Sequence, residues 1–484
     1  MGSIDSAPAV VWFRQDLRLA DNPALAAACQ GDRPVTALYV LDEAGEGDWP
    51  LGGASRWWLH HSLAALDAAL RERGGRLVLR RGEAASVLSE VARETGAGSV
   101  FWNRRYEPAA VARDTAVKAA LQAEGVAARS FNAALLFEPW TIRTGAGEPY
   151  RVFTPFWRAC LQAPAPPAPA AAPARIAAPA LEARSEVLAD WRLTPRAPDW
   201  AGGLRAAWTP GEAAAEARLQ AFLQGALDGY GQDRDRPDRS GTSRLSPHLH
   251  FGEIGPRRVW AGVQALGGGT ADAEKFLQEL GWREFCHHLL FHVPALPTAS
   301  FREAFDAFPW ADDPGALEAW RRGRTGYPVV DAGLRELWTT GWMHNRVRMI
   351  AASFLVKHLL QDWRAGQAWF WDTLVDADLA NNAASWQWVA GSGADAAPYF
   401  RIFNPVLQGE KFDPDGAYVR RWVPELAALP AAWIHKPWAA PAQVLERAGV
   451  RLGAAYPRPV VDHAAARERA LAAFAGLKAS RDTA

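Results

Sequence analysis

Cysteine and methionine are scarce in this chain of 484 residues, which contains three of each. Cys29, Cys160 and Cys286 are too widely spaced for a disulfide framework or a zinc motif, so we expect no bound metal and a reducing compartment, the cytoplasm. No apolar run reaches the roughly eighteen residues of a transmembrane helix. Met1–Pro8 lacks a basic region followed by an apolar core, so we expect no secretory signal.

Net charge is also missing, because 53 Lys and Arg residues balance 53 Asp and Glu residues. Binding of nucleic acid through bulk charge is therefore excluded, and any such site must be a local patch. The composition, 49% hydrophobic and 22% charged, excludes disorder and a fibrous fold for the chain as a whole. Tryptophan, in contrast, is abundant: 24 Trp stand against 20 Phe and 8 Tyr, more indole than a core needs.

The first 135 residues alternate short apolar runs with segments of helical period. The expected strands are 10–13, 35–40, 77–79, 100–102 and 126–131, and the expected helices are 22–28, 56–73, 84–93 and 109–124. This alternation predicts βαβ units and a parallel sheet. No G-x-G-x-x-G follows Phe13, so a dinucleotide site of the Rossmann type is unsupported there.

The composition and the hydrophobic pattern of the chain change in its second third. Residues 163–179 are almost only Ala and Pro, which predicts a connector or a long surface loop. Beyond about residue 190, helical periods dominate. We predict a Rossmann-like α/β domain at 8–135, a Pro/Ala-rich connector at 136–195 and an all-helical domain at 196–475.

Two segments of the helical part carry candidate chemistry. In Thr242–Pro247, Ser246 is expected to cap a helix that begins at Pro247, and the hydroxyls and N–H groups there suit a diphosphate. A plain capped loop explains this spacing more simply. In the helix expected at Glu274–His292, Glu279 and Arg283 stand one turn apart beside Trp282. They form either a solvent-exposed ion pair or a desolvated carboxyl group with a raised pKa.

Two further segments place polar groups on helices. Asn345 and Met349 are one turn apart and Arg348 adjoins them, while Val347, Ile350, Phe354 and Leu355 form the packing stripe. If 376–388 is helical, Asp378, Asn382 and Trp386 stack along one line. Arg348 is the candidate partner for one of the two carboxylates, which would be costly to bury unpaired. Ordinary surface helices are the alternative for both segments.

Together these strings resemble the photolyase/cryptochrome family, most of all its bacterial photolyases for cyclobutane pyrimidine dimers. The resemblance covers nearly the whole chain, from Trp12–Arg18 through Tyr418–Trp438, with long, specific motifs at Thr242–Pro247, Trp342–Met349, Asp376–Trp388 and Pro398–Pro405. It implies an N-terminal α/β antenna domain and a C-terminal helical domain that encloses FAD.

The resemblance also implies roles for individual residues. Asp376 is expected to pair with Arg348, Asp378 to accept from a flavin ring N–H, and Asn382 to face flavin N5. Trp386, Trp363 and Trp310, in order outward, match the indoles that reduce the photoexcited flavin. The full set expected around FAD is Tyr230, Thr242, Ser243, Arg244, Leu245, Ser246, Phe276, Arg283, Arg348, Asp376, Ala377, Asp378 and Asn382.

The implied reaction is light-driven DNA repair, in which reduced FAD donates an electron to a dimer flipped out of the duplex and the ring splits. Trp282 and Trp388 are expected to stack on the dimer, and Glu279 and Asn345 to bind its edges. The expected catalytic set is Glu279, Asn345, Met349 and Asn382. Arg234 and Arg401 match DNA contacts, and the wider candidate patch adds Arg346, Lys411 and Arg421. We expect a monomer without a membrane partner.

Three side chains discriminate between members of the family. At the N5 position photolyases carry Asn, as Asn382 here, whereas plant-type cryptochromes carry Asp. Photolyases for (6-4) products have His where this chain has Asn345 and Met349. Many cryptochromes lack one of the stacking indoles, and this chain has both. Cyclobutane-dimer repair is therefore the expected function, and a blue-light photoreceptor without repair is the alternative. A plain flavoprotein redox enzyme is a further alternative, but no nicotinamide-binding site is visible in this sequence.

The second chromophore stays open. Folate-binding bacterial relatives have Asn-Glu shortly after the match to Tyr106-Glu107, but Pro108–Ala110 follows here, so those contacts are missing. Methenyltetrahydrofolate in another pose, lined by Glu148, Tyr150 and indoles, a deazaflavin, and an empty pocket are the alternatives.

Overall fold

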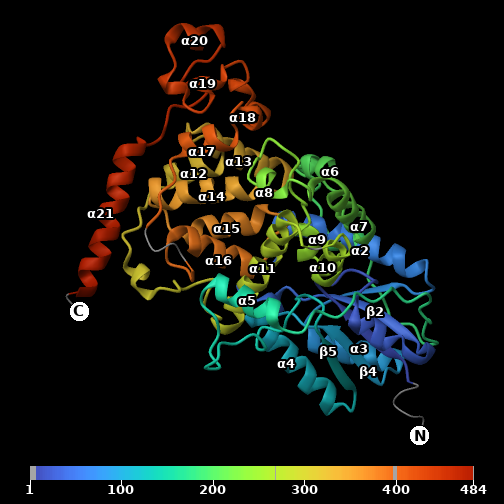
Figure 1. Cartoon of the computed structure of the whole chain (residues 1–484). Coiled ribbons are helices and arrows are strands. Elements are labelled where there is room, and N and C mark those ends of the chain that lie inside the picture. The colour runs from blue at the N-terminus through green and yellow to red at the C-terminus, as the bar shows by residue number, and fades with distance from the viewer. Residues whose placement is uncertain (1–6, 268, 396–399, 483–484) are drawn as a thin grey trace. The chain divides into compact units, whose positions relative to one another are not determined.

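The structure is a computed structural model that describes residues 7–267, 269–395 and 400–482 (Figure 1). The chain forms two compact units whose segments interleave along the sequence. Unit 1 consists of Met1–Ala201, Trp208–Gly225 and Ser243–Pro294, and unit 2 of Gly202–Ala207, Ala226–Thr242 and Ala295–Ala484. The predicted boundaries at 135 and 195 follow secondary-structure content rather than these units, and they stay a prediction.

Unit 1 contains the predicted parallel sheet, with strand order β3-β2-β1-β4-β5. Every residue of β1, β2 and β4 is buried, because helices cover both faces and the strands are continuous apolar runs. The strands are β1 (Ala9–Phe13), β2 (Val35–Leu41), β3 (Leu77–Arg81), β4 (Ser99–Asn103) and β5 (Ala127–Phe131).

The helices between the strands also fall where they were predicted. They are α1 (Pro23–Ala28), α2 (Gly53–Arg71), α3 (Ala84–Thr95) and α4 (Pro108–Ala123). Asn22 caps α1, since its side chain accepts from Leu25 N at 3.1 Å. Residues 163–179 contain no helix or strand, only an isolated bridge from Ala177 to Pro34, so this segment is a long loop within unit 1. The predicted connector at 136–195 stays a prediction.

Later helices of unit 1 carry part of the candidate site. They are α5 (Phe153–Gln162), α7 (Glu212–Ala221), α9 (Ser246–His250), α10 (Pro256–Ala265) and α11 (Ala271–His292). An added Cβ at Gly281 of α11 would lie 2.5 Å from Cε3 of Trp157 on α5. Glycine is therefore what lets these two helices approach.

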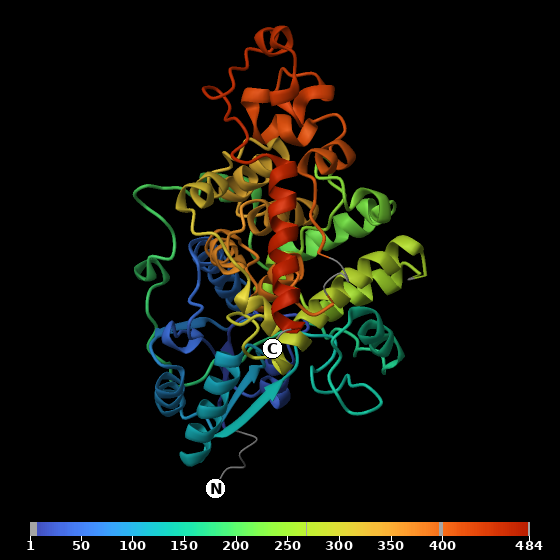
Figure 2. The same cartoon turned by 90° about the vertical axis from the view of Figure 1, so that its left-hand side faces the viewer.

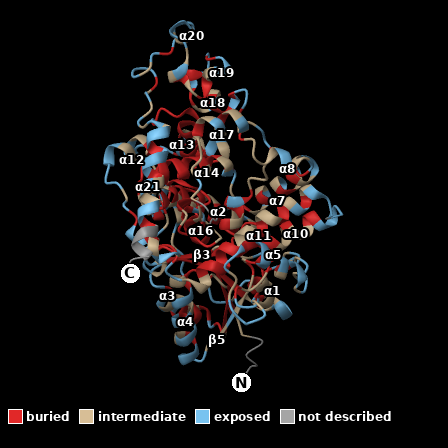
Figure 3. Ribbon diagram, turned by 60° about the vertical axis from the view of Figure 1, so that its left-hand side comes forward, coloured by how far each residue is buried: buried red, intermediate tan, exposed pale blue. Residues whose placement is uncertain are grey.

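The described residues of unit 2 form helices joined by loops and no named strand, as predicted (Figure 2). Its buried residues gather around α13 and α14, the red ribbons of Figure 3, where Trp320, Trp363 and Tyr418 are fully buried. The predicted stripe Val347, Ile350, Phe354 and Leu355 belongs to this core, which confirms it. Among the described helices, none is long and apolar enough to cross a membrane.

The helices of unit 2 range from one turn to five turns in length. They are α6 (Gly202–Ala207), α8 (Tyr230–Asp233), α12 (Pro314–Arg321), α13 (Pro328–Thr340), α14 (Asn345–Ser353), α15 (Trp363–Thr373), α16 (Leu379–Ala390), α17 (Pro405–Phe412), α18 (Ala417–Trp422), α19 (Ala431–Ile434), α20 (Ala442–Arg447) and α21 (His463–Asp482). A π-helical turn, η6 (Phe354–His358), continues α14.

Candidate functional site

The predicted pair between Arg348 and Asp376 is present in unit 2. Arg348 Nη2 lies 2.8 Å from Asp376 Oδ2, and Arg348 Nε donates to Met343 O at 2.7 Å. The other carboxylate oxygen of Asp376, Oδ1, is buried and has no hydrogen-bond partner. A buried acceptor without a partner is unfavourable, so this atom marks a place where a ligand donor fits.

Asp378 stands just before α16 rather than within it. Its Oδ1 accepts from Asn381 N at 2.8 Å and from Asn381 Nδ2 at 2.6 Å, which makes Asp378 the N-cap of the helix. Asn382 and Trp386 lie one turn apart on α16, as predicted. The helical condition set for 376–388 is met only from Leu379 onward, because Asp378 caps the helix.

The amide of Asn382 has a fixed orientation. Asn382 is buried, and its Nδ2 donates to Gln367 O of α15 at 3.0 Å. One of the two amide N–H groups is thus used inside the protein, and Oδ1 can accept a hydrogen bond.

Trp386 is buried between α15 and other rings. Its ring centroid lies 5.0 Å from that of Phe370 and 6.2 Å from that of Trp320. An added Cβ at Gly366 would lie 2.1 Å from Trp386 Cη2, so α15 can pack here only with glycine. Sequence reasoning missed both Gly366 and the contact to Trp320, because neither has a local pattern.

The outer indoles of the predicted chain occupy different environments. Trp363 is the first residue of α15 and is fully buried, with the Arg364 guanidinium 4.5 Å from its ring centroid. Trp310 is half-buried after the turn η5 (Glu303–Ala307), and its ring centroid lies 4.5 Å from that of Phe308. Their predicted order from the flavin stays a prediction.

The lesion-binding candidates of unit 2 lie on α14 and α16. Asn345, the first residue of α14, is exposed, and Met349 is half-buried. Trp388 is half-buried and donates from Nε1 to Asp395 O at 3.1 Å. Trp388 also lines a small cavity with Ser353, Lys357, Val389, Gly391, Arg401 and Phe403.

A basic groove with a volume of about 620 Å³ lies in unit 2. Three members of the predicted DNA patch, Arg346, Arg401 and Lys411, line it. Arg346 is held there by Asp235, 2.7 Å away. The full lining is Asp235, Arg346, Phe400, Arg401, Ile402, Phe403, Asn404, Leu407, Gln408, Lys411, Phe412, Arg467 and Leu471. We call it the basic groove.

Two members of the predicted patch do not line the basic groove. Arg234 instead lies over the buried ring of Tyr230, with its guanidinium carbon 5.5 Å from the ring centroid. Arg421 is exposed on α18. The first two residues of the Pro398–Pro405 motif, Pro398 and Tyr399, lie outside the described residues.

The predicted helix cap at Ser246 is wrong. The helix α9 begins at Ser246 itself, and Leu245 takes the N-cap position without a side-chain hydrogen bond. The backbone of Leu245 is already near-helical, and the left-handed residue before it, Arg244 at φ 50°, makes the turn. Arg244 lies over Trp208, with its guanidinium carbon 4.4 Å from the ring centroid.

The helix expected at Glu274–His292 is confirmed as α11, which begins at Ala271 after the cap Thr270. Phe276 is buried against Phe222, with ring centroids 4.5 Å apart, and Glu279 is half-buried.

The C-terminal half of α11 is tied to the loop after β5. Arg283 Nη1 donates to Ala134 O at 2.7 Å, and Glu284 accepts from Leu136 N at 2.9 Å. Burial raises the pKa of Glu284, against the lowering effect of Arg283. These contacts fix the position from which the side chain of the preceding residue, Trp282, projects.

Trp282 lies flat on Phe153 of α5. The ring centroids are 3.8 Å apart and the planes are within 9° of parallel. Sequence reasoning placed Trp282 in the site but did not find Phe153, which is far away along the chain.

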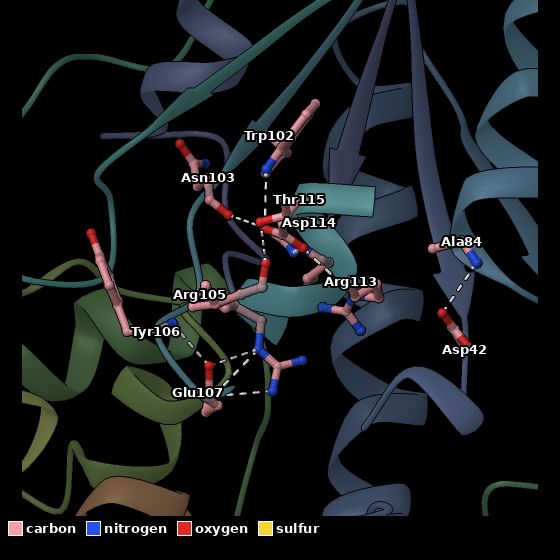
Figure 4. A network of polar contacts seen from close by, with 12 residues as sticks. Asp42, Ala84, Trp102, Asn103, Arg105, Tyr106, Glu107, Arg113, Asp114 and Thr115 are labelled. Atoms are coloured by element: carbon pink, nitrogen blue, oxygen red, sulfur yellow. Dashed lines mark hydrogen bonds and ion pairs between the residues drawn. The ribbon is translucent and has the colours of Figure 1, made fainter. Parts of the chain in front are cut away.

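The carboxyl edge of the sheet in unit 1 carries a paired charge network. Glu107 accepts from the Arg105 side chain and from Tyr106 N, and Asp114 accepts from Trp102 Nε1 (Figure 4). Arg105 Nη1 also lies 2.7 Å from Glu46. Burial alone would raise the pKa of Glu46, but Arg105 and Arg113 outweigh it and hold the pKa at about 2. The adjoining cavity of about 30 Å³ has room for water rather than for a chromophore.

Comparison with known proteins supplies two family matches. Residues 9–174 match the model described as "DNA photolyase", and residues 276–476 match the "FAD binding domain of DNA photolyase". The deoxyribodipyrimidine photo-lyase of Agrobacterium fabrum is 55% identical over 98% of this chain and 99% of its own length. Cryptochrome-1 of Arabidopsis thaliana is 44% identical over 95% of this chain and 69% of its own length.

The fold agrees with these matches. The crystal structure of a bacterial class III photolyase from Agrobacterium tumefaciens superimposes with a TM-score of 0.95 at 55% identity, covering 98% of each chain. The chain belongs to the photolyase/cryptochrome family, and it is similar over its whole length to enzymes named deoxyribodipyrimidine photo-lyases.

Proposed function

We propose that the protein is a light-driven DNA-repair enzyme that splits cyclobutane pyrimidine dimers with reduced FAD. The residues of unit 2 fit the flavin: Asp376 Oδ1 is buried without a partner, and the Asn382 amide, oriented by its bond to Gln367 O, can offer Oδ1 as an acceptor. Reduced FAD, excited by blue or near-ultraviolet light, supplies one electron to the dimer and recovers it after the ring has split. The chain's own residues bind, orient and shield the reactants.

The roles of these residues follow from their contacts. Arg348 holds Asp376 in place, so Asp376 Oδ1 can accept from a donor on the cofactor. Asn382 Oδ1 can accept from the N–H that flavin N5 carries when the ring is reduced, which favours that form. Asp378 is proposed as a further acceptor, and Trp386 as the first electron donor to oxidised FAD.

On the lesion side, each proposed contact has a matching geometry. Trp282 offers an indole that Phe153 already supports on one face. Trp388 offers a second indole, held by Asp395 O. Glu279, Asn345 and Met349 are proposed to touch the pyrimidine edges, and all three are half-buried or exposed, as an entering ligand requires. The basic groove is proposed to hold DNA phosphates.

The amide side chain of Asn382 is the observation that favours repair over signalling. Asn382 donates to Gln367 O, which a carboxylate in its place cannot do without first binding a proton. A carboxylic acid there can pass its proton to the flavin, whereas an amide cannot. Asn382 therefore suits an enzyme that keeps its flavin fully reduced.

A blue-light photoreceptor without repair is the second candidate, and the 44% identity to a plant cryptochrome favours it. The test is repair of an oligonucleotide that contains a single thymine dimer, by FAD-loaded and chemically reduced protein under blue light. We expect restored thymines in the light and none in the dark. Tight, light-independent binding without repair would contradict the enzyme and favour the photoreceptor.

A second chromophore, methenyltetrahydrofolate or a deazaflavin, is proposed to serve as the antenna of unit 1. The paired charges around Glu46, Arg105 and Arg113 would have to move to admit it at the sheet edge. Absorption spectra of the purified protein before and after release of FAD would identify it, because each chromophore has its own band. Spectra that contain flavin bands alone would contradict an antenna.

A further inference from the structure

We infer that the C-terminal helix α21 (His463–Asp482) is a wall of the DNA-binding surface and that Arg467 contacts a backbone phosphate. The inference rests on the proposed function, because it extends the groove assigned there to DNA. Arg467 and Leu471 of α21 line the basic groove together with Arg346, Arg401 and Lys411.

One face of α21, the stripe formed by Arg467, Leu471 and Phe474, lies toward the groove. Arg467 and Leu471 are one turn apart, and Phe474 continues the same stripe. The ring of Phe474 is stacked on Phe400, with centroids 4.6 Å apart and planes within 8° of parallel. Phe400 itself lines the groove and directly precedes Arg401. The stripe thus contributes both a cation and the support for a neighbouring part of the wall.

The helix α21 is anchored in unit 2, both at His463, one turn before Arg467 on the same stripe, and on the adjoining face. Arg469 Nη2 donates to His358 O at 2.6 Å, and His463 Nδ1 lies 2.8 Å from His358 Nε2. Ala466 and Ala470 are fully buried. These contacts hold α21 in place. The exposed Arg467 side chain therefore projects from a fixed position.

The charge of the groove identifies its ligand as a polyanion. Of the described residues that line it, four are cationic, Arg346, Arg401, Lys411 and Arg467, and one, Asp235, is a carboxylate. Arg346 is paired with Asp235, and the described lining residues carry more cations than carboxylates. Phe400, Phe403 and Phe412 stand between the cations, and such interleaving of rings and cations suits a nucleic-acid strand.

The test measures affinity of the FAD-loaded full chain for dimer-containing and undamaged duplexes as a function of salt. Arg467→Ala should weaken binding of both duplexes by the same factor and lower the slope of log affinity against log salt by about one unit. Arg467→Lys should restore the slope. The control is Arg447→Ala, which removes the same charge from the exposed face of α20, outside the groove lining.

The outcomes separate this inference from the proposed function. A salt slope lowered by about one unit in Arg467→Ala but not in Arg447→Ala supports the inference even if the parent protein repairs no dimers, a result that would contradict only the proposed function. Normal repair by the parent, with Arg467→Ala and Arg447→Ala indistinguishable in slope and affinity, overturns the inference and leaves the function intact. Thermal unfolding and flavin content of each variant verify that the fold is unchanged.

Discussion

Trp282 lies flat against Phe153 at 3.8 Å, so one face of this indole is already covered and one face remains for a ligand. A supported ring loses little freedom when it stacks on a base, whereas Trp388 is held mainly through its Nε1 hydrogen bond. Trp282→Ala and Trp388→Ala should each weaken binding of dimer-containing DNA by roughly 1–3 kcal/mol.

The matched test for Trp282 is Phe153→Leu, which removes the support and leaves the indole. It should weaken lesion binding less than Trp282→Ala does, while flavin content and photoreduction stay normal in all three variants. Unchanged lesion affinity in both tryptophan variants would rule out the stacking assignment.

Glu279 is half-buried on α11 and is proposed to hydrogen-bond the dimer. Glu279→Ala should leave FAD bound but lower the repair yield per absorbed photon, because a hydrogen bond to a charged group contributes about 1.5–3 kcal/mol. Glu279→Gln, whose amide can both donate and accept a hydrogen bond, should recover part of the yield. Equal yields in parent and Glu279→Ala would exclude this role.

The contact between Trp386 and Trp320 gives the proposed electron path a rival branch. Trp310→Phe should suppress light-driven reduction of oxidised FAD by an external donor and leave repair by pre-reduced protein unchanged. Trp320→Phe is the comparison, since the aromatic bulk is kept in both changes. Suppression in Trp320→Phe but not in Trp310→Phe would move the path to Trp320.

Gly366 sets how closely α15 packs on Trp386. Gly366→Ala would place a methyl group 2.1 Å from Cη2 and should destabilise the protein by about 1–3 kcal/mol through overpacking. It should also slow photoreduction, because the indole must move. Gly476→Ala is the control: an added Cβ there meets nothing within 4 Å, so unfolding should be unchanged or slightly harder. Equal melting curves for the two variants would contradict this packing.

Lys357 is buried under the groove wall, where its Nζ donates to Arg401 O at 2.8 Å and lies 3.9 Å from the centre of the Phe400 ring. Burial lowers the pKa of Lys357 from 10.5 to about 7. Between these values the unfolded chain binds a proton that the folded protein does not, so stability rises with pH across this window and is lowest below it.

The free energy of unfolding of the parent, minus that of Lys357→Met, should therefore increase from pH 7 to pH 10, on the order of 1 kcal/mol per pH unit. Urea unfolding of both proteins at several pH values measures this difference, and other titrating groups cancel in it. A difference that does not change with pH would show that the folded protein keeps the ammonium charged through Phe400 and the Arg401 carbonyl.

The sequence predicted those features that have a local or a chemical pattern. The strands of the sheet are continuous apolar runs, and the Arg348–Asp376 pair follows from the need to neutralise a buried carboxylate. Contacts between distant segments had no such signal: Phe153 beneath Trp282, Trp320 beside Trp386, and Arg467 in the basic groove all depend on tertiary packing. The cap at Ser246 failed because the left-handed Arg244 turns the chain one residue earlier than the Ser-Pro pattern indicates.

The interleaving of the two units has a consequence for synthesis on the ribosome. Unit 1 includes Ser243–Pro294, so its α/β core cannot close when the sheet alone has emerged. The loop after β5 must wait for α11, whose Arg283 and Glu284 bind it. A fragment that ends at residue 195 would therefore expose the surface that α11 covers, and a soluble α/β fragment has to retain the chain through Pro294.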